Sequence, residues 1–245
     1  MALSKIKTTD PMKRTVDALD WQRIGADLDD QGFATTGALL GSEACHALSS
    51  LYDDDDAVFR SHVVMRRHGF GEGEYKYFAY PLPHSIEQLR QAIYPRLAPI
   101  ANEWMAAMGM AHRYPKTLDP FLARCHEAGQ RRPTPLLLKY QTGDYNCLHQ
   151  DLYGEQFFPI QLAILLSQPG TALEGGEFLL TEQRPRMQSR AEVVSLAQGE
   201  GVLFAVNNRP RKGTRGTYRV KMRHGVSRVQ RGHRYTTGII FHDAA

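Results

Sequence analysis

The second half of the chain, from residue 135 onward, consists of short apolar stretches separated by glycine, proline, asparagine or charged residues. Short strands with turn residues at this spacing are typical of a β-sandwich or barrel, and this pattern constrains the fold more than any other feature of the sequence. We expect the apolar run over residues 157–166 to be buried at the centre. The expected strands are Leu136–Gln141, Cys147–Asp151, Pro159–Leu166, Glu177–Leu180, Val193–Leu196, Gly201–Ala205, Tyr218–Val229 and Arg234–Phe241.

The first half is richer in helical patterns. Apolar residues recur at helical spacing in residues 16–28, 86–110 and 119–128, and residues 33–36 and 58–65 are strand candidates. Pro95 is expected to kink or split the longest helix. No change in composition separates the halves, so we expect one domain over residues 1–245. In it, a helical buttress with lid segments (residues 1–133) packs against a mainly β core (residues 134–245).

The charge is unevenly distributed. The formal net charge is +4, but the stretch from Arg184 to Arg234 holds 13 Lys and Arg against two acids, Glu192 and Glu200. Such asymmetry favours an anionic partner, either nucleic acid or an acidic protein. The basic segment 209–215 is expected to be a loop between two strands near the mouth of the barrel. An internal match between acidic and basic parts, or a solvated face, explains the same excess.

Several classes of protein are excluded. Three scattered cysteines, Cys45, Cys125 and Cys147, provide neither a disulfide framework nor a zinc site, which fits a reducing cytoplasm. Residues 1–14 lack the apolar centre of a signal peptide. The apolar run at 157–166 is too short to span a bilayer. We therefore expect a cytoplasmic protein without a membrane partner.

His149-Gln150-Asp151 and the distant His224 have the composition of a metal site. On a strand, alternate side chains share a face, so His149 and Asp151 would point the same way. Two histidines and one carboxylate hold iron(II) on one side and leave positions open for other ligands. His224, about 70 residues later, would complete the site from another strand. The alternatives are an ordinary histidine near a capping aspartate, or a different distal ligand, His233 or His242.

Three further residues form a candidate carboxylate clamp. Arg234 follows a turn expected near Gly232, and on a strand it shares a face with Thr236. A guanidinium binds a carboxylate through two hydrogen bonds, and a hydroxyl adds a third. Tyr140, on the strand before His149, can add a phenol. Together these groups favour a dicarboxylate co-substrate with one end on the metal and the other in the clamp.

A glycine-rich segment precedes three tyrosines. Gly69, Gly71 and Gly73 are followed by Tyr75, Tyr77 and Tyr80. The simpler interpretation is a hairpin turn. The alternative is a lid that closes over a substrate, because lids need mobile backbone and clefts use aromatic residues.

At these residues the sequence resembles the iron(II)/2-oxoglutarate-dependent dioxygenases, over about Thr134 to Asp243. The resemblance implies a double-stranded β-helix (jelly roll), iron(II) bound by His149, Asp151 and His224, 2-oxoglutarate bound at Arg234, Thr236 and Tyr140, and O₂ as second co-substrate. It is strongest to the prolyl-4-hydroxylase-like branch. Its carriers are Tyr140, His149-x-Asp151, Gly175-Gly176-Glu177-Phe178, His224-Gly225-Val226 and Arg234-x-Thr236.

A longer run of residues, from Gly175 to Arg190 and on to Phe241-His242-Asp243, is similar to a bacterial family described as oxygenases acting on damaged nucleic acid. AlkB-type demethylases have a second arginine six residues after the first, where this chain has Ile240. The substrate therefore stays open between modified nucleic acid and a prolyl or other protein residue. A non-catalytic jelly roll that binds nucleic acid or an acidic partner, and a cupin-like enzyme that does not use 2-oxoglutarate, are the further alternatives.

Overall fold

The computed structural model describes residues 10–151, 154–214 and 216–245. Its α-helices are α1 (Pro11–Asp17), α2 (Trp21–Gln31), α3 (Ser42–Asp54), α4 (His84–Ala107) and α5 (Leu118–Glu127), with short 3₁₀ helices η1 (Asp56–Val58) and η2 (Met65–His68). Its strands are β1 (Phe33–Ala38), β2 (Phe59–Val64), β3 (Gly71–Glu72), β4 (Glu74–Phe78), β5 (Leu136–Gln141), β6 (Tyr145–His149), β7 (Ile160–Leu165), β8 (Leu173–Gly175), β9 (Phe178–Gln183), β10 (Arg190–Val194), β11 (Glu200–Ala205), β12 (Asn208–Gly213), β13 (Gly216–Val226) and β14 (Val229–Ile239).

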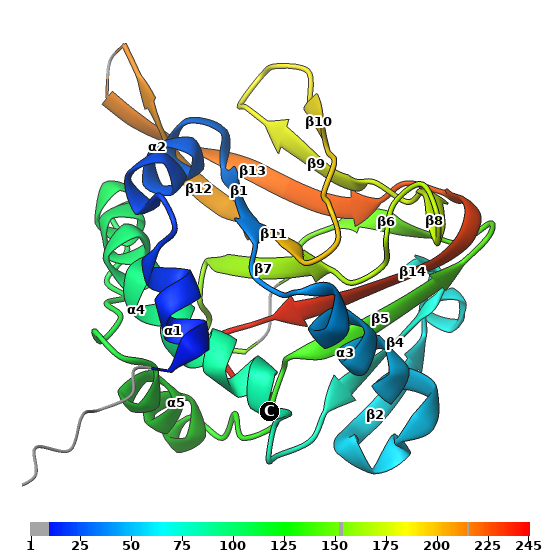
Figure 1. Cartoon of the computed structure of the whole chain (residues 1–245). Coiled ribbons are helices and arrows are strands. Elements are labelled where there is room, and N and C mark those ends of the chain that lie inside the picture. Colours follow the sequence, from blue (N-terminus) through cyan, green and yellow to red (C-terminus); the bar gives the residue numbers. More distant parts are fainter. Residues whose placement is uncertain (1–9, 152–153, 215) are drawn as a thin grey trace, which may run out of the picture.

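Two antiparallel sheets form the core. The larger has the order β1-β11-β7-β14-β5-β4-β2, with β8 also paired to β14, and the smaller has the order β10-β9-β13-β6-β3, with β12 paired to β13. Figure 1 shows one sheet above the other, with α1, α2, α4 and α5 gathered on one side. Side chains of the two sheets meet between them: the rings of Phe178 on β9 and Phe204 on β11 lie 4.9 Å apart. The expected β core with a helical buttress is confirmed.

Strand β7 confirms the expected centre of the core. All its residues are buried, and it pairs with β11 on one side and β14 on the other. A strand buried on both faces needs a continuous apolar sequence, which is why this run shows no alternation.

The strands that carry the site differ in length from those expected. Strand β6 ends at His149, so Asp151 lies two residues beyond it. The expected turn near Gly232 is wrong: β13 ends at Val226 and β14 begins at Val229, so the chain changes sheet at Ser227–Arg228. Gly232 lies inside β14 with φ +86°, and a Cβ there would meet the Ala172 carbonyl oxygen at 2.0 Å. A glycine taken for a turn thus permits a close approach of two backbones.

The sequence predicted that the basic segment 209–215 is a loop near the metal site, and this prediction is wrong. Residues 208–213 form β12, which pairs with β13 in a hairpin, and Arg215 lies outside the described residues. The hairpin tip is eight residues along β13 from His224, roughly 27 Å at the rise of a strand. Alternation within β12 turns Arg209 inward, where it is fully buried.

The helical patterns also needed correction. The expected helix over 16–28 is divided into α1 and α2, because Asp20 caps a new helix by accepting a hydrogen bond from the Arg23 N–H at 3.0 Å. Helix α4 is continuous through Pro95 and Pro99 rather than split. Residues on both sides of Pro95, including Ile93 and Leu97, are completely buried, so packing against the core outweighs the missing hydrogen bond.

The glycine-rich segment belongs to a hairpin, as the simpler interpretation predicted. Strands β2 and β4 pair with each other, and the connection between them contains η2 and β3. Strand β3 pairs with β6 of the other sheet, and a Cβ on Gly71 would meet the Tyr145 carbonyl oxygen at 2.4 Å. This connection therefore bridges the two sheets beside His149.

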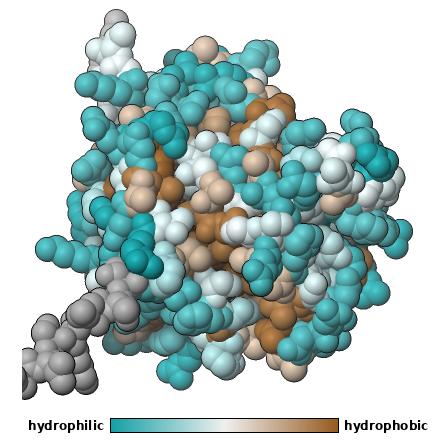
Figure 2. Space-filling view, viewed as in Figure 1, coloured by the Kyte–Doolittle hydropathy of each residue, from teal (hydrophilic) through white to brown (hydrophobic). Residues whose placement is uncertain are grey.

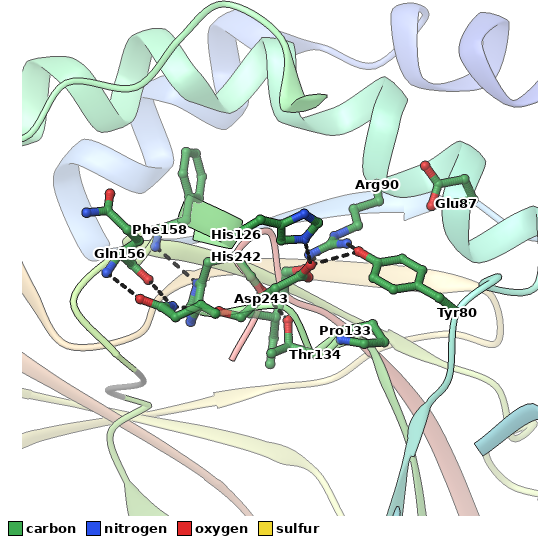
Figure 3. Close-up of polar contacts among 12 residues, drawn as sticks. Tyr80, Glu87, Arg90, His126, Pro133, Thr134, Gln156, Phe158, His242 and Asp243 are labelled. Carbon is green, nitrogen blue, oxygen red and sulfur yellow. Dashed lines mark hydrogen bonds and ion pairs between the residues drawn. The ribbon is translucent and has the colours of Figure 1, made fainter. Parts of the chain in front are cut away.

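The end of the chain is tied to the helices by a buried polar cluster (Figure 3). Asp243 accepts hydrogen bonds from Arg90 of α4 at 2.8 Å and from Tyr80 at 2.9 Å, and its second oxygen also lies 2.8 Å from the His126 ring. Gln130 donates a hydrogen bond to the Asp243 carbonyl. The cluster fixes the residues after β14 against α4 and α5.

On the face shown in Figure 2, hydrophobic residues reach the surface in small patches between hydrophilic ones. Among the helices that the structure describes, none is long and apolar enough to cross a membrane.

Candidate metal and co-substrate site

The three predicted metal ligands lie together between the sheets. Strands β6 and β13 pair so that His149 stands opposite His224, with ring centroids 4.2 Å apart. Asp151, just beyond β6, places one oxygen 3.5 Å from His149 Nε2 and the other 3.4 Å from His224 Nε2. One ligand atom from each residue falls within 4.8 Å of the others. Two imidazoles and a carboxylate on one side of a common point form the donor set that suits iron(II).

The contacts of His149 favour its neutral form, with the Nε2 atom available to bind a metal ion. Its Nδ1–H donates a hydrogen bond to the Cys147 carbonyl at 2.8 Å, which leaves the Nε2 lone pair facing Asp151. Burial lowers the pKa of His149, and the neighbouring His224 lowers it further. The neutral ring therefore predominates at pH 7, as metal binding requires.

His224 is oriented differently. Its Nδ1 is buried and has no hydrogen-bond partner within the described part of the chain. Its ring is packed between aromatic side chains, with the Phe204 centroid at 4.6 Å and the Phe178 ring stacked at 5.9 Å. Packing rather than a hydrogen bond therefore holds this ring in place.

The three clamp residues converge beside the triad. Arg234 stands opposite Tyr140 in the pairing of β14 and β5, with the guanidinium carbon 5.6 Å from the ring centroid. The Tyr140 hydroxyl accepts a hydrogen bond from Asn146, and burial raises its pKa to about 12, so it stays protonated. Arg234 is only 2% exposed, yet in the described residues no carboxylate lies within ion-pair distance of it. Thr236 lies on the same face as Arg234 and is also buried.

A cavity of about 430 Å³ joins the triad to the clamp. Its volume lies in the range of small-molecule sites. Besides His224 Nδ1, three buried polar atoms of its lining residues lack hydrogen-bond partners among the described residues: Arg234 Nε, Thr236 Oγ1 and Gln161 Nε2. Buried polar groups are rarely left unpaired, and a buried guanidinium least of all. These atoms fit a ligand that brings a carboxylate to Arg234, as 2-oxoglutarate would.

The rival histidines are placed elsewhere. His233 is exposed and points away from Arg234, as expected from alternation along β14. His242 is buried in the C-terminal cluster, where its Nδ1 accepts a hydrogen bond from the Phe158 N–H at 3.1 Å. Cys147, between β6 residues of the site, is exposed and lines the cavity.

Some lining residues escaped the sequence analysis. Asn146 and Phe204 belong to strands whose local sequence does not distinguish them from other core residues. Tyr75 and Tyr77, noted after the glycine-rich segment, do line the cavity, so that aromatic pattern was informative. Ile240 lines it too, where AlkB-type demethylases would have a second arginine.

Solved structures show the same fold. A prolyl-4-hydroxylase of Pseudomonas putida superposes with a TM-score of 0.54, at 14% identity, over 92% of this chain and 99% of that chain. An oxidoreductase of the 2OG-Fe(II) oxygenase family from Burkholderia pseudomallei gives 0.53, at 14% identity, over 92% and 93%. The chain therefore has the jelly-roll fold of these structures, with a His-Asp-His triad between its two sheets.

The particular family follows from sequence comparison. Residues 73–244 match the family described as "Oxygenase, catalysing oxidative methylation of damaged DNA", and the chain belongs to that family. A protein of Mycobacterium tuberculosis, named only as an uncharacterized protein, is 53% identical over 168 residues, which are 69% of this chain and 72% of the relative. The predicted superfamily is confirmed.

Proposed function

We propose that this protein hydroxylates a C–H bond of a modified nucleic-acid base, with iron(II) held by His149, Asp151 and His224. In this proposal 2-oxoglutarate is bound at Arg234, Thr236 and Tyr140. One observation carries the proposal: the buried Arg234 faces the same cavity as the triad and has no acid within ion-pair distance among the described residues. Such an arginine is costly unless a ligand supplies the missing carboxylate.

Iron(II) together with 2-oxoglutarate and O₂ supplies an oxidant able to break a C–H bond, while 2-oxoglutarate is converted to succinate and CO₂. The chain's own residues bind, orient and exclude water. Asp151 supplies the single negative charge of the donor set, and the two imidazoles bind as neutral ligands. Arg234 and Thr236 orient the co-substrate through its far carboxylate. Leu138, Leu162 and other apolar side chains line the cavity and limit its water.

The substrate class is supported by the family to which the chain belongs. Hydroxylation of a methyl group on a ring nitrogen gives an N-hydroxymethyl group, which leaves as formaldehyde and restores the base. The second oxygen atom of O₂ goes into succinate. The prolyl-4-hydroxylase of Pseudomonas putida shares the fold only, since the identity is 14%. A protein-residue hydroxylase therefore remains the alternative to be tested.

The test is succinate formation by the purified protein with added iron(II) and 2-oxoglutarate, with and without a methylated oligonucleotide. We expect slow turnover alone, faster turnover with the oligonucleotide, and one formaldehyde per additional succinate. Stimulation by a proline-rich peptide without formaldehyde would favour protein hydroxylation. No succinate under any condition would contradict the oxygenase proposal and favour a binding module.

Two variants separate the parts of the site. Asp151→Ala should abolish iron(II) binding and turnover. Arg234→Ala should leave iron binding intact but raise the 2-oxoglutarate concentration needed for half-maximal turnover by about 100-fold, since truncating one partner of a buried charge pair costs about 2–5 kcal/mol. An unchanged 2-oxoglutarate requirement in Arg234→Ala would indicate a cupin-like enzyme that uses another co-substrate.

A further inference from the structure

Large apolar side chains are exposed to solvent at the rim of the cavity. Phe70 is 48% exposed and Leu148 is 45% exposed, and both line the cavity mouth. Phe70 is the last residue of the segment Met65–Phe70, which contains η2. We call this segment the lip. Exposed large apolar residues beside a functional cavity are typical of a surface that contacts a ligand.

The lip is a preformed platform. The Phe70 N–H donates to the Met65 carbonyl at 3.2 Å, and the Phe70 carbonyl accepts from the Cys147 N–H at 2.9 Å. The ring of His68 stacks on Phe70, with centroids 5.3 Å apart and planes 23° from parallel. The lip is thereby fixed to β6, two residues before the metal ligand His149, and a ring stacked on it would lose little additional freedom.

The lip also carries positive charge. Arg66 is largely exposed and approaches Glu72 at 3.8 Å, and Arg67 is exposed with no ion pair in the described parts of the chain. Exposed aromatic rings next to arginines are the combination that binds single-stranded nucleic acid, because bases stack on the rings and phosphates pair with the cations. A purely apolar peptide would gain nothing from the two arginines.

The depth of the triad decides between single and double strands. Asp151 and His224 are both buried, so a base must enter the cavity to reach the metal site. A base in a duplex must unpair and unstack before it can enter the cavity. The free-energy cost of turning a base inward is much smaller in a single strand.

Resting on the proposed function, we infer that the lip is the binding site for single-stranded nucleic acid, with the nucleotide next to the target stacked on Phe70 and its phosphates at Arg66 and Arg67. The hairpin of β12 and β13, whose sequence is more basic, is then not the substrate surface. The rim of the cavity then binds the single-stranded nucleic acid, and the buried position of the triad disfavours a duplex.

The experiment measures binding of a fluorescent single-stranded oligodeoxynucleotide by anisotropy, in parallel with RNA of the same sequence and with the duplex. Phe70→Leu removes the ring but keeps an apolar side chain, and Phe70→Tyr keeps the ring. Met187→Ala is the matched control, because Met187 is 58% exposed and does not line the cavity. Lys212→Ala tests the rival hairpin. Thermal midpoints establish that each variant is folded.

We expect Phe70→Leu to weaken single-strand binding about tenfold, and Phe70→Tyr and Met187→Ala to change it less than about twofold. Replacing Arg66 and Arg67 by alanine should reduce the slope of log K against log salt by about one to two. The inference is overturned if Phe70→Leu and the arginine variant bind like wild type, if Lys212→Ala carries the loss, or if the duplex binds more tightly. Wild-type succinate formation, measured separately, reports the proposed function itself, so the two failures are distinguishable.

Discussion

At the scale of single residues, the two metal histidines are held by different forces. Histidine ligands usually donate their second ring N–H to an oxygen, which fixes the tautomer and orientation of the ring. His149 does so through Cys147, whereas Nδ1 of His224 has no such partner in the part of the chain described. Phe178 and Phe204 surround the His224 ring instead. The geometry of this ligand therefore depends on aromatic packing.

This dependence gives a prediction for Phe178→Leu. The smaller side chain leaves His224 free to rotate, so we expect iron(II) or cobalt(II) to bind about tenfold more weakly, within the range seen when outer partners of a ligand are removed. Metal titration followed by absorbance checks it. Phe121→Leu, at an equally buried ring far from the triad in sequence, is the matched control for general loss of packing. Equal metal affinity in both variants would contradict the role of Phe178.

The residues that the sequence revealed are those with a local pattern. The spacing of His149 and Asp151, and of Arg234 and Thr236, places each pair on one side of the chain, and the structure brings both pairs to one cavity. Phe204 has no such pattern. It lies against the His224 ring because of how the strands are arranged, and the sequence around Phe204 does not predict this. Gly232 was misinterpreted because a glycine suits both a turn and a close approach of backbones.

At the scale of elements, the segment after β14 connects helix α4 with the residues just before β7. Asp243 is paired with Arg90 of α4 and with Tyr80, as Figure 3 shows. The adjacent His242 accepts a hydrogen bond from the N–H of Phe158, seven residues after Asp151. The end of the chain therefore contacts both α4 and Phe158, two residues before the start of β7.

His242 predicts a pH dependence of stability. Burial lowers its pKa from 6.5 to about 4, so the unfolded chain binds a proton between these values that the folded chain does not. Stability should therefore fall as the pH drops from about 6.5 to about 4, by on the order of 3 kcal/mol from this group. His242→Asn keeps a hydrogen-bond acceptor but cannot titrate. Urea unfolding at pH 7 and pH 4.5 checks the difference, and equal acid sensitivity of both proteins would contradict it.

Elements were predicted where the hydrophobic pattern decides, and missed where tertiary packing overrides local preference. Helix α4 continues through Pro95 because its buried face is held by the core. Strand β12 looked like a basic loop because its inward residues include Arg209, which no hydrophobic pattern identifies as buried. The burial of Arg209 depends on Glu182 of β9, which supplies the carboxylate, and on backbone carbonyls at the end of α2.

At the scale of the whole molecule, Glu182 balances three of the 13 basic residues between Arg184 and Arg234. Its carboxylate is buried and pairs with Arg184 at 2.8 Å, with Arg211 at 3.2 Å and with Arg209. Arg209 also donates to the backbone carbonyls at the end of α2, at 2.9 Å each. The alternative of an internal match between acid and base is thus correct for these three arginines, and the match joins the N-terminal helices to the β core.

Replacing Glu182 by glutamine should therefore lower the free energy of unfolding of the whole protein. Arg209 would remain fully buried without a carboxylate, and breaking a buried pair in this way costs about 3–5 kcal/mol. Guanidinium unfolding checks the loss, and Glu192→Gln is the matched control, since its pair with Arg190 at 3.2 Å lies at the surface and should contribute less than about 1 kcal/mol. Equal stability of the two variants would show that the cluster contributes nothing beyond a surface ion pair.

The same substitution has a pH signature that separates it from a simple packing defect. Burial alone would raise the pKa of Glu182, but the hydrogen bond from Arg184 and the charges of Arg209 and Arg211 lower it below its usual 4.5. A carboxyl group of this kind stabilises the fold above pH 4.5 and loses that contribution as the pH falls through its folded pKa. Wild type should thus approach Glu182→Gln in stability on acidification. A constant difference between them at pH 7 and pH 3 would mean that the side chain acts by shape rather than by charge, and that the basic half of the chain is anchored by some other contact.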